Sequence, residues 1–100
     1  MPSTEQEIIS DIKKYIQQGG GTYSAWYVGI SQKARDRLFN GHGVHEKGDW
    51  WIYRQAYTSK AARNVERYFV NTLGADGGTG GGDEDADYVY AYKKSSHTDP

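Results

Sequence analysis

The amino-acid sequence predicts an α+β fold, a small and mainly antiparallel β-sheet flanked by helices. Three short segments have the aromatic and β-branched composition of strands: residues 22–30, 50–57 and 88–92. Three segments with helical hydrophobic periodicity alternate with these strands along the chain: residues 5–18, 32–40 and 60–73. The length of 100 residues is that of one domain.

The first helix is predicted to begin after Thr4. Thr4 and Glu7 have the spacing of a capping box, in which each side chain accepts a hydrogen bond from the other residue's backbone. The apolar residues that follow recur on one helical face: Ile8, Ile12, Tyr15 and Ile16. Gly19 is expected to end the helix, since glycine adopts the left-handed cap conformation without strain.

Two further helices are predicted from their caps and apolar faces. Ser31 is expected to cap the second helix, in which Ala34 and Leu38 face inward. Thr58 or Ser59 is expected to cap the third helix, and its apolar stripe consists of Ala62, Val65, Phe69 and Leu73.

Two segments are too polar to compensate for the entropy of ordering them. Residues 76–87 form a low-complexity Gly/Asp loop, and residues 95–100 are expected to be a disordered tail. Residues 1–94 are therefore predicted to form a single domain with an N-terminal helix.

The composition excludes several classes of protein. The chain contains no cysteine, which excludes disulfides and thiolate metal sites. No apolar run approaches the roughly 20 residues of a membrane helix, and the N-terminus lacks the apolar core of a secretory signal. These features predict a cytoplasmic protein without membrane contact.

Charge is distributed unevenly along a chain whose net charge is only −1. Residues 28–70 contain eight lysines and arginines against four acids, whereas residues 71–100 contain two lysines against six acids. The basic central segment suits contact with a polyanion, although an ordinary solvated surface has the same pattern.

The segment around Gly29 is the first candidate for chemistry. Tyr27 lies two residues before Gly29, and a glycine in a strand lets another group approach the backbone closely. Arg37 flanks the buried face of the helix that follows, where its guanidinium suits bidentate binding of a phosphate. A buried strand followed by a solvated helix would produce the same sequence.

Glu66 and two histidines are further candidates. Glu66 borders the apolar stripe of the third helix, where a carboxylate suits Mg²⁺ or Mn²⁺, or alternatively an ion pair with Arg63 or Arg67. His42 and His45 are two loop histidines without a third obvious ligand, which is a weak signal for zinc.

Together these residues resemble the GIY-YIG nuclease family over residues 21–73. Tyr27-Val-Gly29 is similar to the family's YIG element, and Arg37-Leu38 lies where the family has its catalytic arginine, eight residues after the glycine. Ser59 to Glu66 resembles the start of the helix that carries the family's metal-binding glutamate.

The resemblance implies a metal-dependent endonuclease that hydrolyses phosphodiester bonds in DNA. Glu66 would hold one Mg²⁺ or Mn²⁺ ion, Arg37 would bind the scissile phosphate, and Tyr27 with a second tyrosine would position or deprotonate the attacking water. The basic residues expected to contact DNA are Lys33, Arg35 and Arg63.

The chain departs from the family pattern in three places. Tyr23 lies too close to Tyr27 for two strands and a turn, so either both share one strand or the partner strand is remote, with Tyr88 or Tyr90 in it. His42 lies one residue later than the family's histidine, which follows the arginine by four. The family's late asparagine has no clear match.

A catalytically inactive module with the GIY-YIG fold, binding nucleic acid or a protein partner, is the alternative function. Four aromatic residues offer a platform for bases or for a partner, or else belong to the core: Trp26, Trp50, Trp51 and Tyr53.

Overall fold

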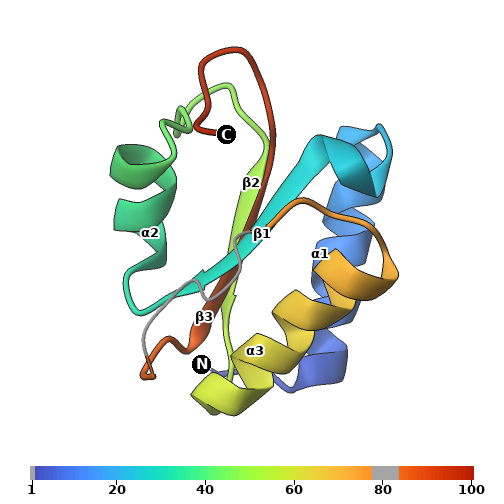
Figure 1. Cartoon of the computed structure of the whole chain (residues 1–100), viewed down its shortest axis with the longest axis vertical. Helices are drawn as coiled ribbons and strands as arrows, with labels where there is room; N and C mark the ends of the chain where they lie inside the picture. Colours follow the sequence, from blue (N-terminus) through green and yellow to red (C-terminus); the bar gives the residue numbers. More distant parts are fainter. Residues whose placement is uncertain (1, 78–83) are drawn as a thin grey trace.

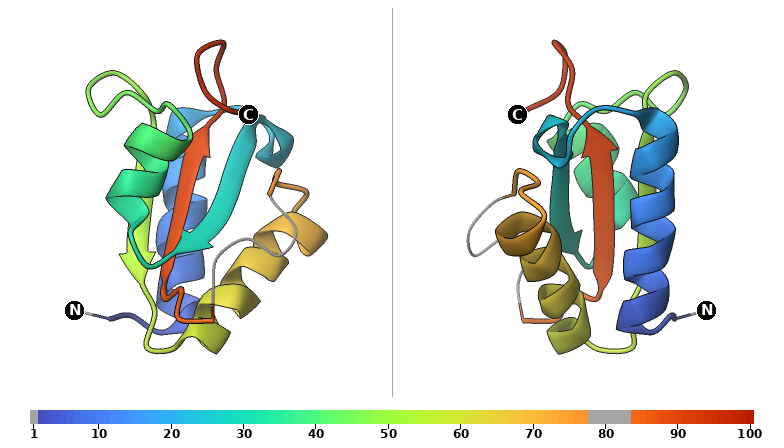
Figure 2. Two further views of the ribbon diagram at one scale, coloured as in Figure 1. Left: turned by 60° about the vertical axis from the view of Figure 1, so that its left-hand side comes forward. Right: turned by 90° about the vertical axis from the view of Figure 1, so that its right-hand side faces the viewer.

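The computed structural model describes residues 2–77 and 84–100, and it has the predicted α+β architecture. A three-stranded antiparallel sheet has the order β1-β3-β2, so the C-terminal strand lies in the centre. The strands are β1 (Trp26–Ser31), β2 (Trp51–Gln55) and β3 (Tyr88–Lys93). As Figures 1 and 2 show, α1 (Glu5–Gly19) and α3 (Ser59–Arg67) cover one face, and α2 (Ala34–Asp36) covers the other.

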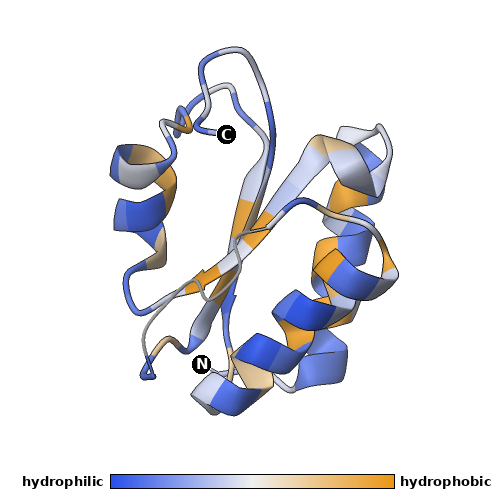
Figure 3. Cartoon of the chain, viewed as in Figure 1, coloured by the Kyte–Doolittle hydropathy of each residue, from blue (hydrophilic) through white to orange (hydrophobic). Residues whose placement is uncertain are grey.

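The face beneath α1 and α3 carries the main hydrophobic core. Alternate residues of the strands point into it because side chains in a strand alternate between faces, and Val28, Ile52 and Ala91 are examples. The predicted stripes of both helices are buried there, including Ile8, Ile12, Ile16, Ala62, Val65 and Phe69. Figure 3 shows the orange, apolar sides of α1 and α3 turned inward.

The helix caps follow the sequence closely. Thr4 and Glu7 form the predicted capping box at the start of α1. Thr58, one of the two expected caps, accepts a hydrogen bond from the backbone N–H of Ala61 at the start of α3. α2 begins two residues later than predicted, at Ala34, because Lys33 has a non-helical backbone and donates its N–H to the Ser31 side chain.

Two helices end in a wider, π-helical turn. α2 continues as η2 (Arg37–Gly41), where the N–H of His42 bonds to the carbonyl of Arg37, five residues earlier. α3 continues as η3 (Tyr68–Thr72) with the same spacing between Leu73 and Tyr68. Such turns accommodate one additional residue in a helix and are frequent at functional sites.

The C-terminal residues, expected to be disordered, fold back onto the molecule. The N–H of Asp99 donates to the carbonyl of His42, so the tail lies against the loop that follows η2 (Figure 1). The predicted Gly/Asp loop is described only in part, and its residues 78–83 lie outside the described residues. Among the described helices, none is long and apolar enough to cross a membrane.

Candidate functional site

Beneath α2, the sheet presents tyrosines instead of aliphatic residues. The three strands direct aromatic side chains to this face: Tyr27, Trp51, Tyr53, Tyr88, Tyr90 and Tyr92. Tyr90 and Tyr92 are 1% and 0% exposed. The ring of Tyr27 stacks on Tyr92 with ring centroids 5.3 Å apart and lies tilted against His42 with centroids 4.7 Å apart.

Gly29 makes room for the central side chain of this cluster. Gly29 lies directly opposite Tyr90 in the β1–β3 pairing. A Cβ atom at Gly29 would meet the hydroxyl oxygen of Tyr90 at 2.5 Å and its Cζ at 2.6 Å. The Tyr90 ring therefore crosses β1 over a position that only glycine can occupy without displacing it.

His42 connects this cluster to the C-terminal tail. Its Nε2 lies 2.8 Å from the Tyr90 hydroxyl, and its Nδ1 lies against the carbonyl oxygen of Asp99. A carbonyl only accepts, so Nδ1 carries the proton. Burial lowers the pKa of His42, the Asp99 carbonyl raises it in part, and Arg37 lowers it further. The ring is then neutral near pH 7, and its Nε2 accepts the proton of the Tyr90 hydroxyl.

The π-helical turn places His42 beside Arg37. In an α-helix, residues four apart lie on one face, so His42 would be rotated away from Arg37 by its additional residue. The turn η2 absorbs that residue, and its N–H to carbonyl bond joins His42 directly to Arg37. The histidine that lies one residue late in the sequence therefore reaches the same cluster.

Arg37 and Glu66 both act on Tyr90. Burial chiefly raises the pKa of Tyr90 above that of an ordinary tyrosine, and the nearby Glu66 carboxylate adds to this. Arg37 opposes the rise through its charge and a hydrogen bond to the hydroxyl. Arg37 thus bonds to the Tyr90 hydroxyl, whereas Glu66, on α3 at the opposite face of the sheet, acts on Tyr90 only through its charge.

Glu66 carries an unsatisfied acceptor. Its Oε2 is buried and has no hydrogen-bond partner among the residues that the structure describes. Burial raises the pKa of Glu66, and the charges of Arg63 and Arg67 partly offset this. A buried carboxylate oxygen without a partner is costly, and a hard divalent cation such as Mg²⁺ or Mn²⁺ would satisfy it.

The remaining predicted residues lie outside this cluster. Tyr23 packs against Phe69 on the opposite face of the sheet, with ring centroids 6.4 Å apart. Tyr23 lies in a short turn before β1, and the strand that pairs with β1 is the remote β3, which carries Tyr88 and Tyr90. Lys33 is exposed at the start of α2, whereas Arg35 bonds to Glu46 at 2.7 Å and lies over Trp51.

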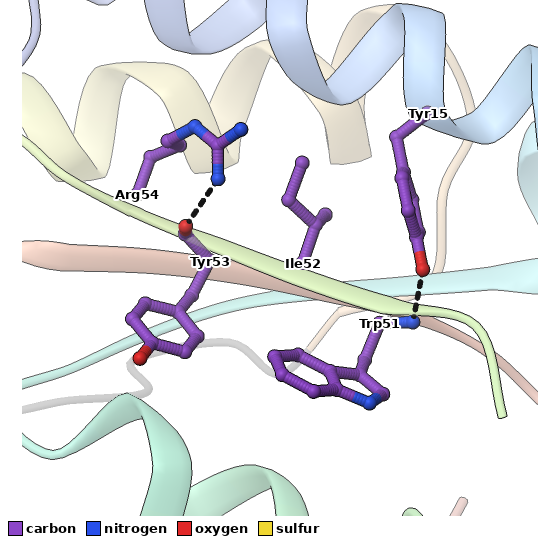
Figure 4. A pocket seen from close by; sticks show the side chains of 5 residues that line it. All are labelled: Tyr15, Trp51, Ile52, Tyr53 and Arg54. Carbon is purple, nitrogen blue, oxygen red and sulfur yellow. Dashed lines mark hydrogen bonds between the residues drawn. The ribbon is translucent and has the colours of Figure 1, made fainter. Parts of the chain in front are cut away.

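The proposed aromatic platform is divided between different parts of the fold. Trp26 is fully buried in the main core, while Trp50 is 41% exposed. Trp51 and Tyr53 line a pocket of about 430 Å³ at the edge strand β2. Figure 4 shows them pointing to the opposite side of β2 from Ile52 and Tyr15, and the Tyr15 hydroxyl accepts the N–H of Trp51 at 2.8 Å.

Comparison of the chain with family models, with curated proteins and with solved structures found no significant match.

A second cluster contains ligands suited to a metal. Ligand atoms of His45, Asp49 and His97 all lie within 4.8 Å of one another. The sequence pointed to His42 and His45 as zinc ligands. In the structure only His45 belongs to this cluster, because the His42 side chain turns inward to Tyr90. Asp49 and His97 were missed, since His97 lies in a tail that local sequence does not connect to the loop.

Proposed function

We propose that the chain is a metal-dependent phosphodiesterase acting on DNA, an endonuclease related in arrangement to the GIY-YIG family. The observation that carries the proposal is the buried Oε2 of Glu66, which has no hydrogen-bond partner among the described residues, together with the hydrogen bond of Arg37 to the Tyr90 hydroxyl. A guanidinium, a tyrosine hydroxyl and a free carboxylate oxygen are the groups that metal-assisted phosphodiester hydrolysis requires.

The strand order supports a rearranged version of that family. In the GIY-YIG family, which the sequence resembles, a strand that carries a tyrosine pairs with the strand of the YIG element. Here β3 pairs antiparallel with β1 and places Tyr90 opposite Gly29. We therefore assign to Tyr90 the role that the family gives to its first tyrosine, although Tyr90 comes last in the chain.

Each side chain has a role that follows from its position. Glu66 would hold one Mg²⁺ or Mn²⁺ ion, which supplies a Lewis acid for the phosphate and lowers the pKa of bound water. Arg37, exposed at its outer surface, would bind the scissile phosphate and stabilise the charge that develops on it. Tyr27 packs against His42 and would confine the water at the site.

Tyr90 and His42 form a route for a proton. The Tyr90 hydroxyl donates to Nε2 of neutral His42, 2.8 Å away. When the hydroxyl oxygen accepts a proton from the attacking water, its own proton passes to Nε2. The resulting imidazolium would be held at Nδ1 by the Asp99 carbonyl.

Nicking of supercoiled plasmid tests this function. We expect nicking with Mg²⁺ or Mn²⁺, and Arg37→Ala should reduce its rate by roughly two to three orders of magnitude, the usual loss for one preorganised charge stabiliser. Arg37→Lys should also be slow, because lysine lacks the planar fork. Arg35→Ala is the matched control, since Arg35 already bonds to Glu46. Equal losses in the Arg35 and Arg37 variants would refute the assignment.

A DNA-binding module without hydrolysis is the second candidate. It is favoured by the raised pKa values of Tyr90 and Tyr92, for which burial is the main cause, because a protonated tyrosine is a weak base. In that case the wild type would retain DNA in a mobility-shift assay, Arg37→Ala would weaken retention, and neither cation would produce nicking.

A further inference from the structure

The loop that follows η2 and the C-terminal tail bring three metal-binding side chains together. His45 and Asp49 belong to the loop, and His97 belongs to the tail. The Nε2 of His97 lies 2.5 Å from Oδ2 of Asp49. The rings of His45 and His97 are parallel within 11°, with centroids 3.8 Å apart.

Backbone contacts hold both segments in this arrangement. The N–H of His45 donates to Oδ2 of Asp49 at 2.7 Å, which fixes the carboxylate within the loop. The Asp99 N–H donates to the His42 carbonyl and joins the tail to the loop, while the Ser95 N–H donates to the Thr98 hydroxyl and closes a turn around His97. A Cβ at Gly43 would meet the carbonyl oxygen of His97 at 3.0 Å, so the tail packs closely on the loop.

The ligand set is that of a transition metal. Two imidazoles and one carboxylate suit Zn²⁺ and its neighbours, whereas Mg²⁺ prefers oxygen ligands and water. Tetrahedral zinc with bonds of about 2.0–2.1 Å separates its ligand atoms by roughly 3.3 Å. The three donor atoms here lie within 4.8 Å of one another, and side-chain rotations that separate the two stacked imidazole rings would direct them at one ion.

We propose that His45, Asp49 and His97 bind one Zn²⁺-type ion, which replaces the proton between His97 and Asp49 and fastens the C-terminal tail to the loop. Three protein ligands leave the fourth position to water. The site is separate from Glu66 in both residues and ligand chemistry.

The site has a consequence for the tyrosine cluster. The tail that carries His97 also carries Asp99, whose carbonyl accepts the Nδ1 proton of His42. An ion that fastens the tail would therefore hold His42 in the tautomer that presents Nε2 to Tyr90.

Calorimetric titration of the full chain with Zn²⁺ tests the site without reference to nuclease activity. We expect one equivalent to bind, and Co²⁺ to give the visible absorption of a four-coordinate complex. His97→Ala and Asp49→Asn should each weaken Zn²⁺ binding at least tenfold, the effect of removing one direct ligand. Asp49→Asn retains an acceptor for the His45 N–H, so the loop should keep its shape.

Two controls separate this site from others. Glu84→Gln removes an exposed carboxylate elsewhere and should leave Zn²⁺ affinity unchanged. Mg²⁺ should produce no binding that depends on His97. Absence of Zn²⁺ binding at 100-fold excess over protein, or equal affinity in the wild type and His97→Ala, would overturn the proposal, while a failure to nick DNA would not affect it.

Discussion

Glu66 combines a poor contribution to stability with a proposed role in cation binding. Its buried Oε2 has no hydrogen-bond partner within residues 2–77 and 84–100, and burial raises the pKa of the Glu66 carboxyl. The charged form is therefore disfavoured in the folded protein above that raised pKa, and the penalty disappears as the pH falls below the ordinary value of 4.5. This is the pattern expected where function has been retained at the expense of stability.

Glu66→Gln should accordingly stabilise the metal-free protein. The neutral amide avoids the desolvation of a charge, a gain of about 1 kcal/mol, which corresponds to roughly 4–8 °C in melting temperature for a domain of this size. The gain should be present at pH 7.5 and should shrink toward pH 4.5. Thermal denaturation in chelator measures it, with Glu84→Gln as the exposed control. A lower melting temperature for Glu66→Gln would show that the carboxylate has a partner.

The substitution Gly29→Ala tests whether nicking depends on the position of the Tyr90 side chain against Gly29 and His42. The added Cβ would lie 2.5 Å from the Tyr90 hydroxyl oxygen, so the buried ring has to shift away from His42. We expect about 1–3 kcal/mol of destabilisation from overpacking and about a hundredfold loss of nicking from misplacement. Tyr90→Phe keeps the ring and removes the hydroxyl, so it should lose nicking with a smaller change in melting temperature. Full nicking by Gly29→Ala would exclude Tyr90 from the site.

Among the elements, α2 and its continuation η2 determine whether the side chains of Arg37 and His42 lie on the same side of the helix. The bond from the His42 N–H to the Arg37 carbonyl spans five residues, one more than in an α-helix. His42 lies five residues after Arg37, one more than the spacing of an α-helix, and the helix accommodates this by widening.

Deletion of Gly41 provides a test of this element. It would leave His42 four residues after Arg37, on the same face of an ordinary α-helix. The deletion variant should retain nicking within about tenfold of the wild type, whereas insertion of one alanine after Gly41 should abolish it, a loss of at least a hundredfold. Plasmid nicking and melting temperature, measured on both variants, distinguish a change in register from unfolding. Equal inactivity of the two folded variants would refute the role of the turn.

For the whole molecule, the C-terminus completes both the sheet and the proposed site. β3 lies between β1 and β2, and the tail beyond it reaches His42. Because β3 supplies Tyr90 and Tyr92, and the tail supplies Asp99, the site cannot be assembled until the end of the chain is in place.

The stability of the molecule should fall in mild acid because of His42. Burial lowers its pKa below 6.5, so the unfolded chain binds more protons than the folded one between these two values. The free energy of unfolding is therefore highest above pH 6.5, and it decreases as the pH falls toward and through the lowered pKa of His42. Melting temperatures from pH 8 to 5 should decrease more steeply for the wild type than for His42→Gln. Parallel curves would mean that His42 is not buried in its neutral form.

Local patterns were sufficient for the elements of this protein. The capping box at Thr4, the apolar stripes and the strand compositions depend on neighbouring residues, because helix and strand periodicity are properties of short segments. The same local information singled out Tyr27, Arg37 and Glu66, each by its position relative to a strand or a helical stripe.

The tertiary structure alone decided how these elements combine. The central position of β3 depends on pairing with two distant strands, for example Tyr27 with Tyr92 and Trp51 with Tyr92, and no local pattern encodes such partners. The placement of Tyr90 over Gly29 follows from that pairing, because it sets Tyr90 directly opposite Gly29. The meeting of His97 with Asp49 has the same origin, because folding of the tail onto the loop is a contact between distant segments.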